Sequence, residues 1–127
     1  MSALQKIIEP EFVQHEEAAV RPIDLVHLSR QSLGDPGIEQ EILLMFDQMV
    51  LTHMSRIRQT IDIEVILYNL HSLKGAAAGV GAKNIALLAK AAEEEMKKHN
   101  KLSHESIADL RMAVEEVRHF IAELLGD

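Results

Sequence analysis

Residues 71–82 read HSLKGAAAGVGA, and the rest of the chain is organised around this stretch. Residues three and four positions apart share one face of a helix, so on a helix His71, Lys74 and Gly75 lie side by side. This group combines a nucleophilic imidazole, a cation that balances added negative charge, and a missing side chain that lets a partner come close. The stretch therefore predicts a helix that carries a histidine for phosphoryl transfer.

The helix predicted around His71 has two different faces. At about 100° per residue, the face turned away from His71 is apolar and suits a protein core. Its members are Ile66, Leu70, Leu73 and Ala77. Leu67 and Ala78 lie on the His71 face, within one or two turns of it, where a purely solvated surface would more often carry charges. We expect these two residues to belong to a docking patch around the histidine.

A histidine in a helix is, taken alone, more often an ordinary surface or core residue than a reactive one. Gly75 changes that balance, because glycine inside a helix costs about 1 kcal/mol relative to alanine, and its neighbours here are strong helix formers. Close approach of a partner is a physical reason that offsets this cost. The same neighbours favour a functional role for Lys74 over that of an ordinary surface lysine.

Capping and turn residues divide the whole chain into helices. The predicted helices cover about residues 22–33, 36–60, 63–79, 83–99 and 104–125. No strand pattern competes with them, and loops of about three to six residues make neighbouring helices antiparallel. The predicted fold class is therefore all-α: an up-and-down antiparallel four-helix bundle with an additional short N-terminal helix. A continuous coiled coil is disfavoured, because the glycine-rich turn and the capped breaks interrupt any long heptad run.

The length of 127 residues is that of one domain. Residues 21–127 are predicted to form the helical bundle, and residues 1–20 a tail or a short helix. In this first segment the apolar residues are spaced loosely as in an amphipathic helix, but Pro10 interrupts the pattern. They are Leu4, Ile7, Ile8, Phe12 and Val13.

Composition excludes several classes of protein. The chain has no run of about 18 apolar residues, so we expect no membrane span, and it has no cysteine for a disulfide or a thiol nucleophile. The formal net charge of −7, without a basic cluster, disfavours nucleic acid as a partner. The start of the chain is too soon interrupted by charges to be a secretory signal. We therefore expect a cytoplasmic protein.

Three parts of the chain resemble histidine-containing phosphotransfer (HPt) domains, which relay phosphoryl groups in two-component systems. The first is the motif His71-Ser-Leu-Lys74-Gly75, followed by small residues and Gly81. The second, EILLMF at residues 41–46, looks like the segment of the preceding helix that carries a phenylalanine near the histidine. The third, NIALLAKAAEE at residues 84–94, is similar to the helix packed beside it. The resemblance extends over roughly residues 22–125.

The resemblance implies roles for particular residues. His71 would be phosphorylated. Around it we also expect Phe46 and Met49, from the preceding helix, to contribute to the docking patch. In such domains a hydrogen-bond acceptor that orients the histidine often lies about 22 residues after it, which is Glu93 here. The alternative, that Glu93 is one of three solvated glutamates in a row, is equally open. Lys74 would reduce the cost of placing two negative charges on the imidazole.

The resemblance also implies partners. Response-regulator receiver domains would be donor and acceptor, and a hybrid histidine kinase would lie upstream. The sequence has no nucleotide-binding motif, so we expect a phosphoryl carrier rather than a kinase. We expect no cofactor and no metal on this chain, because Mg²⁺ would belong to the receiver domain. A single capped bundle with an exposed active face favours a monomer.

Two other functions compete with phosphotransfer. The first is a non-catalytic helical adaptor that binds a signalling partner through the His71 face without accepting a phosphoryl group. The second is a metal-binding bundle, but a di-iron bundle needs two Glu-x-x-His motifs, and only Glu116 with His119 fits. We rank the adaptor second and the metal bundle third.

Overall fold

The computed structural model describes residues 21–126, and within this range all regular structure is helical. The five helices are α3 (Leu25–Gln31), α4 (Pro36–Arg58), α5 (Ile63–Val80), α6 (Lys83–His99) and α7 (His104–Leu124). The predicted all-α class is confirmed for this part of the chain. The predictions for residues 1–20 fall outside the described residues and stay predictions.

Side-chain caps start four of the five described helices, all but α6. Asp35, Asp62 and Ser103 each accept hydrogen bonds from backbone N–H groups in the first turn of α4, α5 and α7. Such groups have no partner within the helix, which is why a capping oxygen stabilises the helix start. The predicted start of the first helix at Pro22 is wrong. Asp24 caps α3 through the N–H groups of the second and third helical residues, so α3 begins at Leu25.

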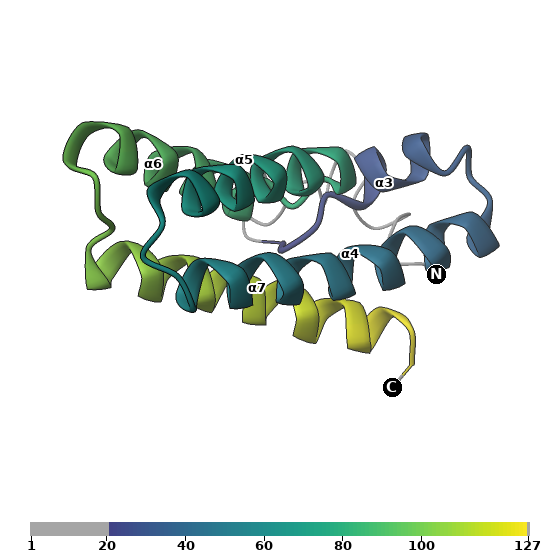
Figure 1. Cartoon of the computed structure of the whole chain (residues 1–127). Coiled ribbons are helices and arrows are strands. Elements are labelled where there is room, and N and C mark those ends of the chain that lie inside the picture. Colours follow the sequence, from purple (N-terminus) through teal and green to yellow (C-terminus); the bar gives the residue numbers. More distant parts are fainter. Residues whose placement is uncertain (1–20, 127) are drawn as a thin grey trace.

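The four long helices form an antiparallel ring, in which each packs against two others (Figure 1). Helix α5 lies between α4 and α6, and α7 closes the ring against α6 and α4. Short α3 packs against α5 and α4. The predicted up-and-down four-helix bundle with an additional short helix is therefore confirmed.

The core is filled by the apolar faces that periodicity predicts. Its largest fully buried apolar side chains are Phe46, Ile23, Leu28, Leu43, Leu70, Leu73, Ile85, Met96, Leu110 and Val50. Leu33, the last residue of the predicted first helix, lies instead in the turn after α3, where it has a φ of 55° and is 89% exposed. Ile38 is also exposed, because the first turn of α4 extends beyond the core.

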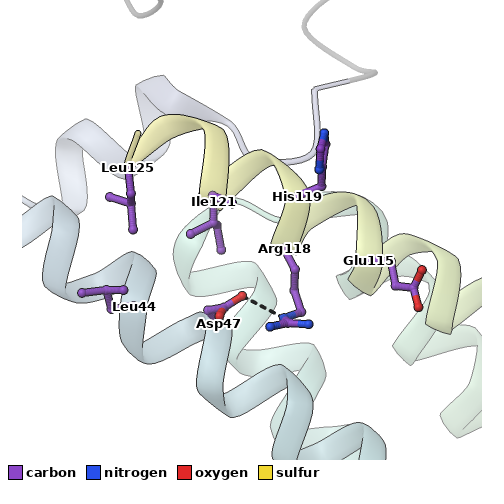
Figure 2. A pocket seen from close by; sticks show the side chains of 8 residues that line it. Leu44, Asp47, Glu115, Arg118, His119, Ile121 and Leu125 are labelled. Carbon is purple, nitrogen blue, oxygen red and sulfur yellow. Dashed lines mark hydrogen bonds and ion pairs between the residues drawn. The ribbon is translucent and has the colours of Figure 1, made fainter. Parts of the chain in front are cut away.

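Two polar contacts tie α4 to its neighbours. The buried His53 ring contacts Asn69 of α5, with 2.8 Å between Nδ1 and Oδ1. On the other side of α4, Arg118 of α7 donates from Nε to Asp47 Oδ1 over 3.0 Å (Figure 2). A buried polar pair is satisfied only in one alignment of two helices, so His53 and Asn69 fix how α5 lies on α4.

Helix α3 fastens the turn between α5 and α6. The Asp24 N–H donates to the Gly81 carbonyl over 2.9 Å, and the Asp24 carboxylate pairs with Lys83 Nζ at 3.0 Å. His27 Nε2 contacts the Gly79 carbonyl at 3.0 Å. Gly81 ends α5 with a φ of 85°, a left-handed conformation that glycine adopts without strain. These contacts fix the direction in which α6 returns along α5.

No helix among residues 21–126 is both long and apolar enough to cross a membrane.

Candidate functional site

His71 lies near the middle of α5, on the face opposite the core. The apolar face of the same helix is buried, through Ile66, Leu70, Leu73 and Ala77. The His71 side chain is 70% exposed. The helix is thus held by one face while the imidazole is presented to solvent on the other.

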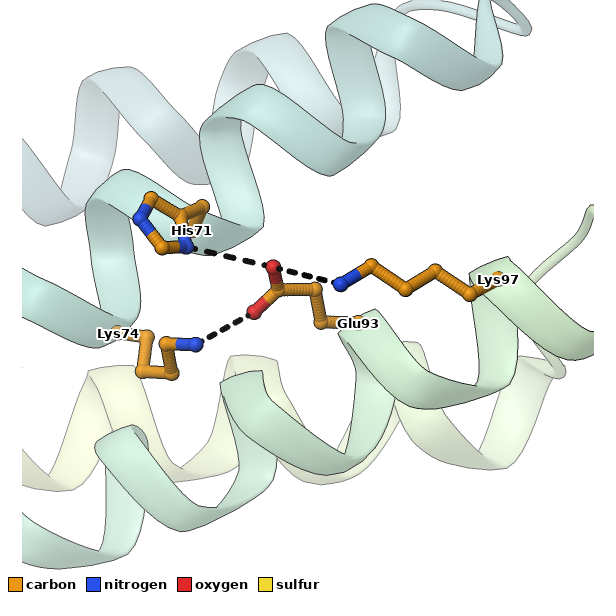
Figure 3. A network of polar contacts seen from close by, with 4 residues as sticks. All are labelled: His71, Lys74, Glu93 and Lys97. Atoms are coloured by element: carbon orange, nitrogen blue, oxygen red, sulfur yellow. Dashed lines mark hydrogen bonds and ion pairs between the residues drawn. The ribbon is translucent and has the colours of Figure 1, made fainter.

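Glu93 of α6 reaches across to His71 (Figure 3). Its Oε2 lies 3.3 Å from His71 Nδ1, and its Oε1 accepts a hydrogen bond of 2.9 Å from Lys74 Nζ. Glu93 is only 7% exposed, so it is not a freely solvated glutamate. The structure thus brings together His71, Lys74 and Glu93, three residues that the sequence predicts for one site.

Hydrogen bonds and charge keep the Glu93 carboxylate ionised. The hydrogen bond from Lys74 lowers the pKa of Glu93, burial acts in the opposite direction, and the charges of Lys74 and Lys97 lower it further, so that the net shift is downward. An ionised carboxylate can only accept hydrogen bonds. His71 Nδ1 must therefore carry the proton of this contact, which leaves Nε2 with a lone pair. In Figure 3 that second nitrogen lies on the side of the ring away from Glu93.

Lys97 is a further charged member of this cluster. Its Nζ lies 3.7 Å from Glu93 Oε2, one helical turn along α6. Lys97 is not among the site residues expected from the sequence, although the spacing of Glu93 and Lys97 is the ordinary i,i+4 spacing of an ion pair on a helix. Only the burial of Glu93 against α5 shows that this pair faces His71 rather than open solvent.

Gly75 and Ala78 are exposed on the same face of α5 as His71. A Cβ placed on Gly75 would have no heavy atom within 4 Å, so nothing inside the described protein requires glycine there. An alanine would fit and would favour the helix. The open space above Gly75 is compatible with close approach by another molecule.

The other predicted docking residues differ in how exposed their side chains are. Met49 of α4 is 38% exposed and could contribute to a surface. Leu67 is partly buried and packs against the core. Phe46 is only 2% exposed, which contradicts its predicted place in the docking patch. Its ring fills the bundle interior, because position 46 belongs to the core face of α4 rather than to its edge.

The single Glu-x-x-His motif does not build a metal site. Glu116 and His119 are both exposed on α7, and His119 pairs instead with Glu123, with 2.8 Å between Nε2 and Oε1. Among the residues described, no three His, Asp or Glu side chains are arranged to hold a metal ion.

Comparison with known families gives one match. The family model described as Hpt domain matches residues 41–120, which include α5, α6 and most of α4 and α7. No curated protein and no solved structure matches the chain. The matched segment contains His71, Lys74, Glu93 and Lys97.

Proposed function

The chain belongs to the Hpt domain family, which implies a phosphotransfer role in a phosphorelay, and from this premise we propose that His71 is the residue that carries the phosphoryl group. His71 would accept it from the phosphorylated aspartate of a receiver domain and pass it to another response regulator. A hybrid histidine kinase is the proposed upstream source. The receiver domains would supply the Mg²⁺.

One observation carries the assignment to His71: its exposed imidazole contacts a buried, ionised carboxylate through Nδ1. Lys74 and Lys97 also pair with this carboxylate. Among residues 21–126, the other pair of a histidine and a carboxylate, His119 with Glu123, has no lysine on its carboxylate. A carboxylate behind a histidine fixes the tautomer and stabilises the positive charge that develops when the ring acts as a nucleophile. Glu93 is placed to do both.

In the proposed step the lone pair of His71 Nε2 attacks the phosphorus of the aspartyl phosphate. The new N–P bond forms as the P–O bond to the aspartate breaks, and the aspartate leaves as a carboxylate. The ring then carries a positive charge, shared between its nitrogens, and its Nδ1–H donates to Glu93. Transfer to the next receiver reverses these events, with an aspartate oxygen as the nucleophile.

Lys74 and Lys97 offset the negative charge of the transferred group. In the free protein both contact Glu93, and neither side chain is fully buried, so each can turn towards a phosphoryl group on His71. Two opposite charges 4 Å apart attract by roughly 4 kcal/mol at the effective dielectric of a protein surface. Competition between Glu93 and the phosphoryl group for the lysines keeps this attraction moderate, which suits a carrier that must release its cargo.

The proposed docking surface surrounds His71 and includes Leu67, Gly75, Ala78 and Met49. Relay contacts are transient and commonly bury less than about 1,200 Å² in total. A monomer is sufficient for this role, because every residue assigned to the site lies in one chain.

The experiment that tests the proposal is transfer of label from a phosphorylated receiver domain. We expect wild type to take up label that is labile to acid and stable to alkali, and His71→Gln to take up none. His119→Gln is the matched control, since His119 also pairs with a carboxylate on an exposed helix face, and this variant should be labelled like wild type. Phosphorus NMR of the labelled protein should show phosphate on Nε2.

Absence of label from several receivers, with folded protein, would contradict the proposal. Partner binding that survives in His71→Gln without any phosphoryl transfer to wild type would instead support the helical adaptor.

A further inference from the structure

A groove of about 450 Å³ lies where α3, α5 and α6 meet. Half of its lining residues are small or apolar: Ala78, Gly81, Ala86 and Leu87. Leu87 lines this groove and is 67% exposed. The groove therefore offers apolar surface that no described residue covers.

The rest of the groove lining is basic. His27, Lys74, Lys83 and Lys90 line it, and no acidic residue does. Lys74 and Lys83 already pair with Glu93 and Asp24, whereas Lys90 forms no ion pair within residues 21–126. An apolar segment with negative charges is the complementary occupant.

Such a segment exists in the same chain. Residues 1–20 contain the five apolar side chains noted above, together with four glutamates and one lysine. This composition matches the groove in both apolar character and sign of charge. The hollow between α4 and α7 is less suited, because its lining already includes Asp47 and Glu115 (Figure 2).

The point of attachment also favours this occupant. Asp24 is hydrogen-bonded to Gly81 and ion-paired with Lys83, both of which line the groove. Residues 1–20 therefore join the bundle within a few residues of the groove. A segment linked to its binding site by a short stretch of chain has an effective concentration there on the order of millimolar. Even weak docking would then be populated.

We propose that residues 1–20 dock in the groove formed by α3, α5 and α6, with their apolar side chains inside it and their glutamates towards its lysines. Because Lys74 and Ala78 belong both to the groove and to the His71 face, the docked segment competes with a receiver domain for that face. This competition rests on the function proposed above, whereas docking itself does not.

The test of docking uses the full chain with a spin label. The chain has no cysteine, so Ser2→Cys gives a single site for attachment. We expect the amide signals of Ala78, Gly81, Ala86 and Leu87 to lose most of their intensity, while signals at the α4–α7 hollow keep theirs. The matched protein carries the same label and the changes Ile8→Ser and Phe12→Ser, which remove two of the apolar side chains of residues 1–20. In it the groove signals should recover.

Equal broadening in the two labelled proteins would show that the segment is only tethered, and would overturn the proposal. A second variant, Lys90→Glu, removes the positive charge that lacks a partner in the described structure, and should also restore the groove signals. Broadening that is unchanged in Lys90→Glu and in the double variant would exclude a specific docked state.

The test of competition is the rate of label transfer from a receiver. We expect Ile8→Ser/Phe12→Ser to take up label several-fold faster than wild type, and equal rates would overturn competition. If His71 takes up no label in either protein, the proposed phosphotransfer fails, while the spin-label result still decides whether the segment docks.

Discussion

At the scale of single residues, Glu93 connects every charged group of the proposed site. One carboxylate contacts an imidazole and two lysines from two helices. Its Oε2 lies 3.3 Å from His71 Nδ1, where it is placed to select the Nδ1–H tautomer, and its Oε1 accepts a hydrogen bond from Lys74 Nζ. A change at Glu93 should affect the chemistry of His71 more than the stability of the bundle, because Lys74 can reach solvent once its partner is removed.

Replacing Glu93 by alanine should lower the rate of phosphoryl transfer to His71 by roughly tenfold or more, since a hydrogen bond to a charged group contributes about 1.5–3 kcal/mol. Glu93→Gln should fall between wild type and alanine, because its amide oxygen still accepts from Nδ1–H. The ¹⁵N shifts of His71 should report a smaller Nδ1–H population in Glu93→Ala. An unchanged tautomer ratio would contradict the orienting role.

Gly75 gives a second prediction at this scale, because stability and transfer should respond in opposite directions. Gly75→Ala should stabilise the protein by about 0.5–1 kcal/mol, as expected for a helix interior with open space around the new Cβ. Gly75→Gln should fold normally and lose most of its transfer activity, because its side chain occupies the space next to His71. Thermal unfolding and label uptake measure the two effects.

Gly79→Gln is the control for Gly75→Gln. Gly79 is also exposed on α5 with open space around it, but it lies about 12 Å along the helix from His71, twice as far as Gly75. Its transfer rate should fall less. Equal losses in the two variants would argue against close approach specifically at Gly75.

At the scale of elements, short α3 restrains the turn between α5 and α6. It brings Asp24 and His27 against the last residues of α5 and the first of α6. This contact spans more than 50 positions in the sequence. Because α6 carries Glu93 and α5 carries His71, the turn that α3 fastens also sets the relative position of the two site residues.

Gly81→Ala should destabilise the protein by about 1–3 kcal/mol. The residue has a φ of 85°, and a Cβ there would lie 3.1 Å from the Asp24 carbonyl oxygen, so both backbone strain and crowding oppose the substitution. Gly79→Ala, two positions earlier, meets no atom within 4 Å and should be neutral or stabilising. Urea unfolding midpoints test the pair. Equal midpoints would mean that α3 does not restrain the turn.

At the scale of the whole molecule, three carboxylates link the stability of the fold to pH. Hydrogen bonds from Lys74 to Glu93 and from Ser106 to Glu95 lower the pKa of each glutamate. For Asp24, burial raises the pKa, but hydrogen bonds from the His27 N–H and from Lys83 outweigh it, so the net shift is downward. All three favour the folded state more when they are ionised.

Stability should therefore be lost on acidification. A carboxyl with a lowered pKa in the folded protein contributes stability above its unfolded pKa, about 3.9 for Asp and 4.3 for Glu, and loses it as pH falls through the folded pKa. We expect the urea midpoint to decrease from about pH 5 downward, and less steeply in Glu93→Gln. Glu94→Gln, at an exposed neighbouring position, should retain the wild-type slope. A midpoint independent of pH over this range would contradict the linkage.

Much of the fold could be predicted from local patterns. The caps Asp35, Asp62 and Ser103 are recognisable because a capping oxygen acts within three residues of itself. The predictions were wrong where contacts between residues distant in the sequence, or the conformation of a turn, determine the structure. Asp24 caps α3 and is tied to Gly81 and Lys83, so the helix begins later than Pro22 suggests. Leu33 has an apolar side chain but sits in a left-handed turn that points it to solvent.

The candidate site also contains residues that the sequence could predict and residues that only the structure could place. His71, Lys74 and Gly75 share a face by helical spacing alone, so their grouping follows from sequence. The position of Phe46 could not be predicted. A small rotation of α4 about its axis would move a residue from the core to the edge of the helix, and the contacts of α4 with α5 and α7 determine that rotation. Lys97 was missed because its importance depends on the burial of its partner.

The sequence by itself determined the four long helices, the caps Asp35, Asp62 and Ser103, and the face of α5 that carries His71, because these depend on interactions between residues a few positions apart. The tertiary structure decided that Glu93 is buried against His71 rather than solvated, that Nδ1 is the ring nitrogen it holds, and that a basic groove adjoins the site. Those features depend on how α3, α5 and α6 pack, and packing joins residues whose separation along the chain carries no periodic signal.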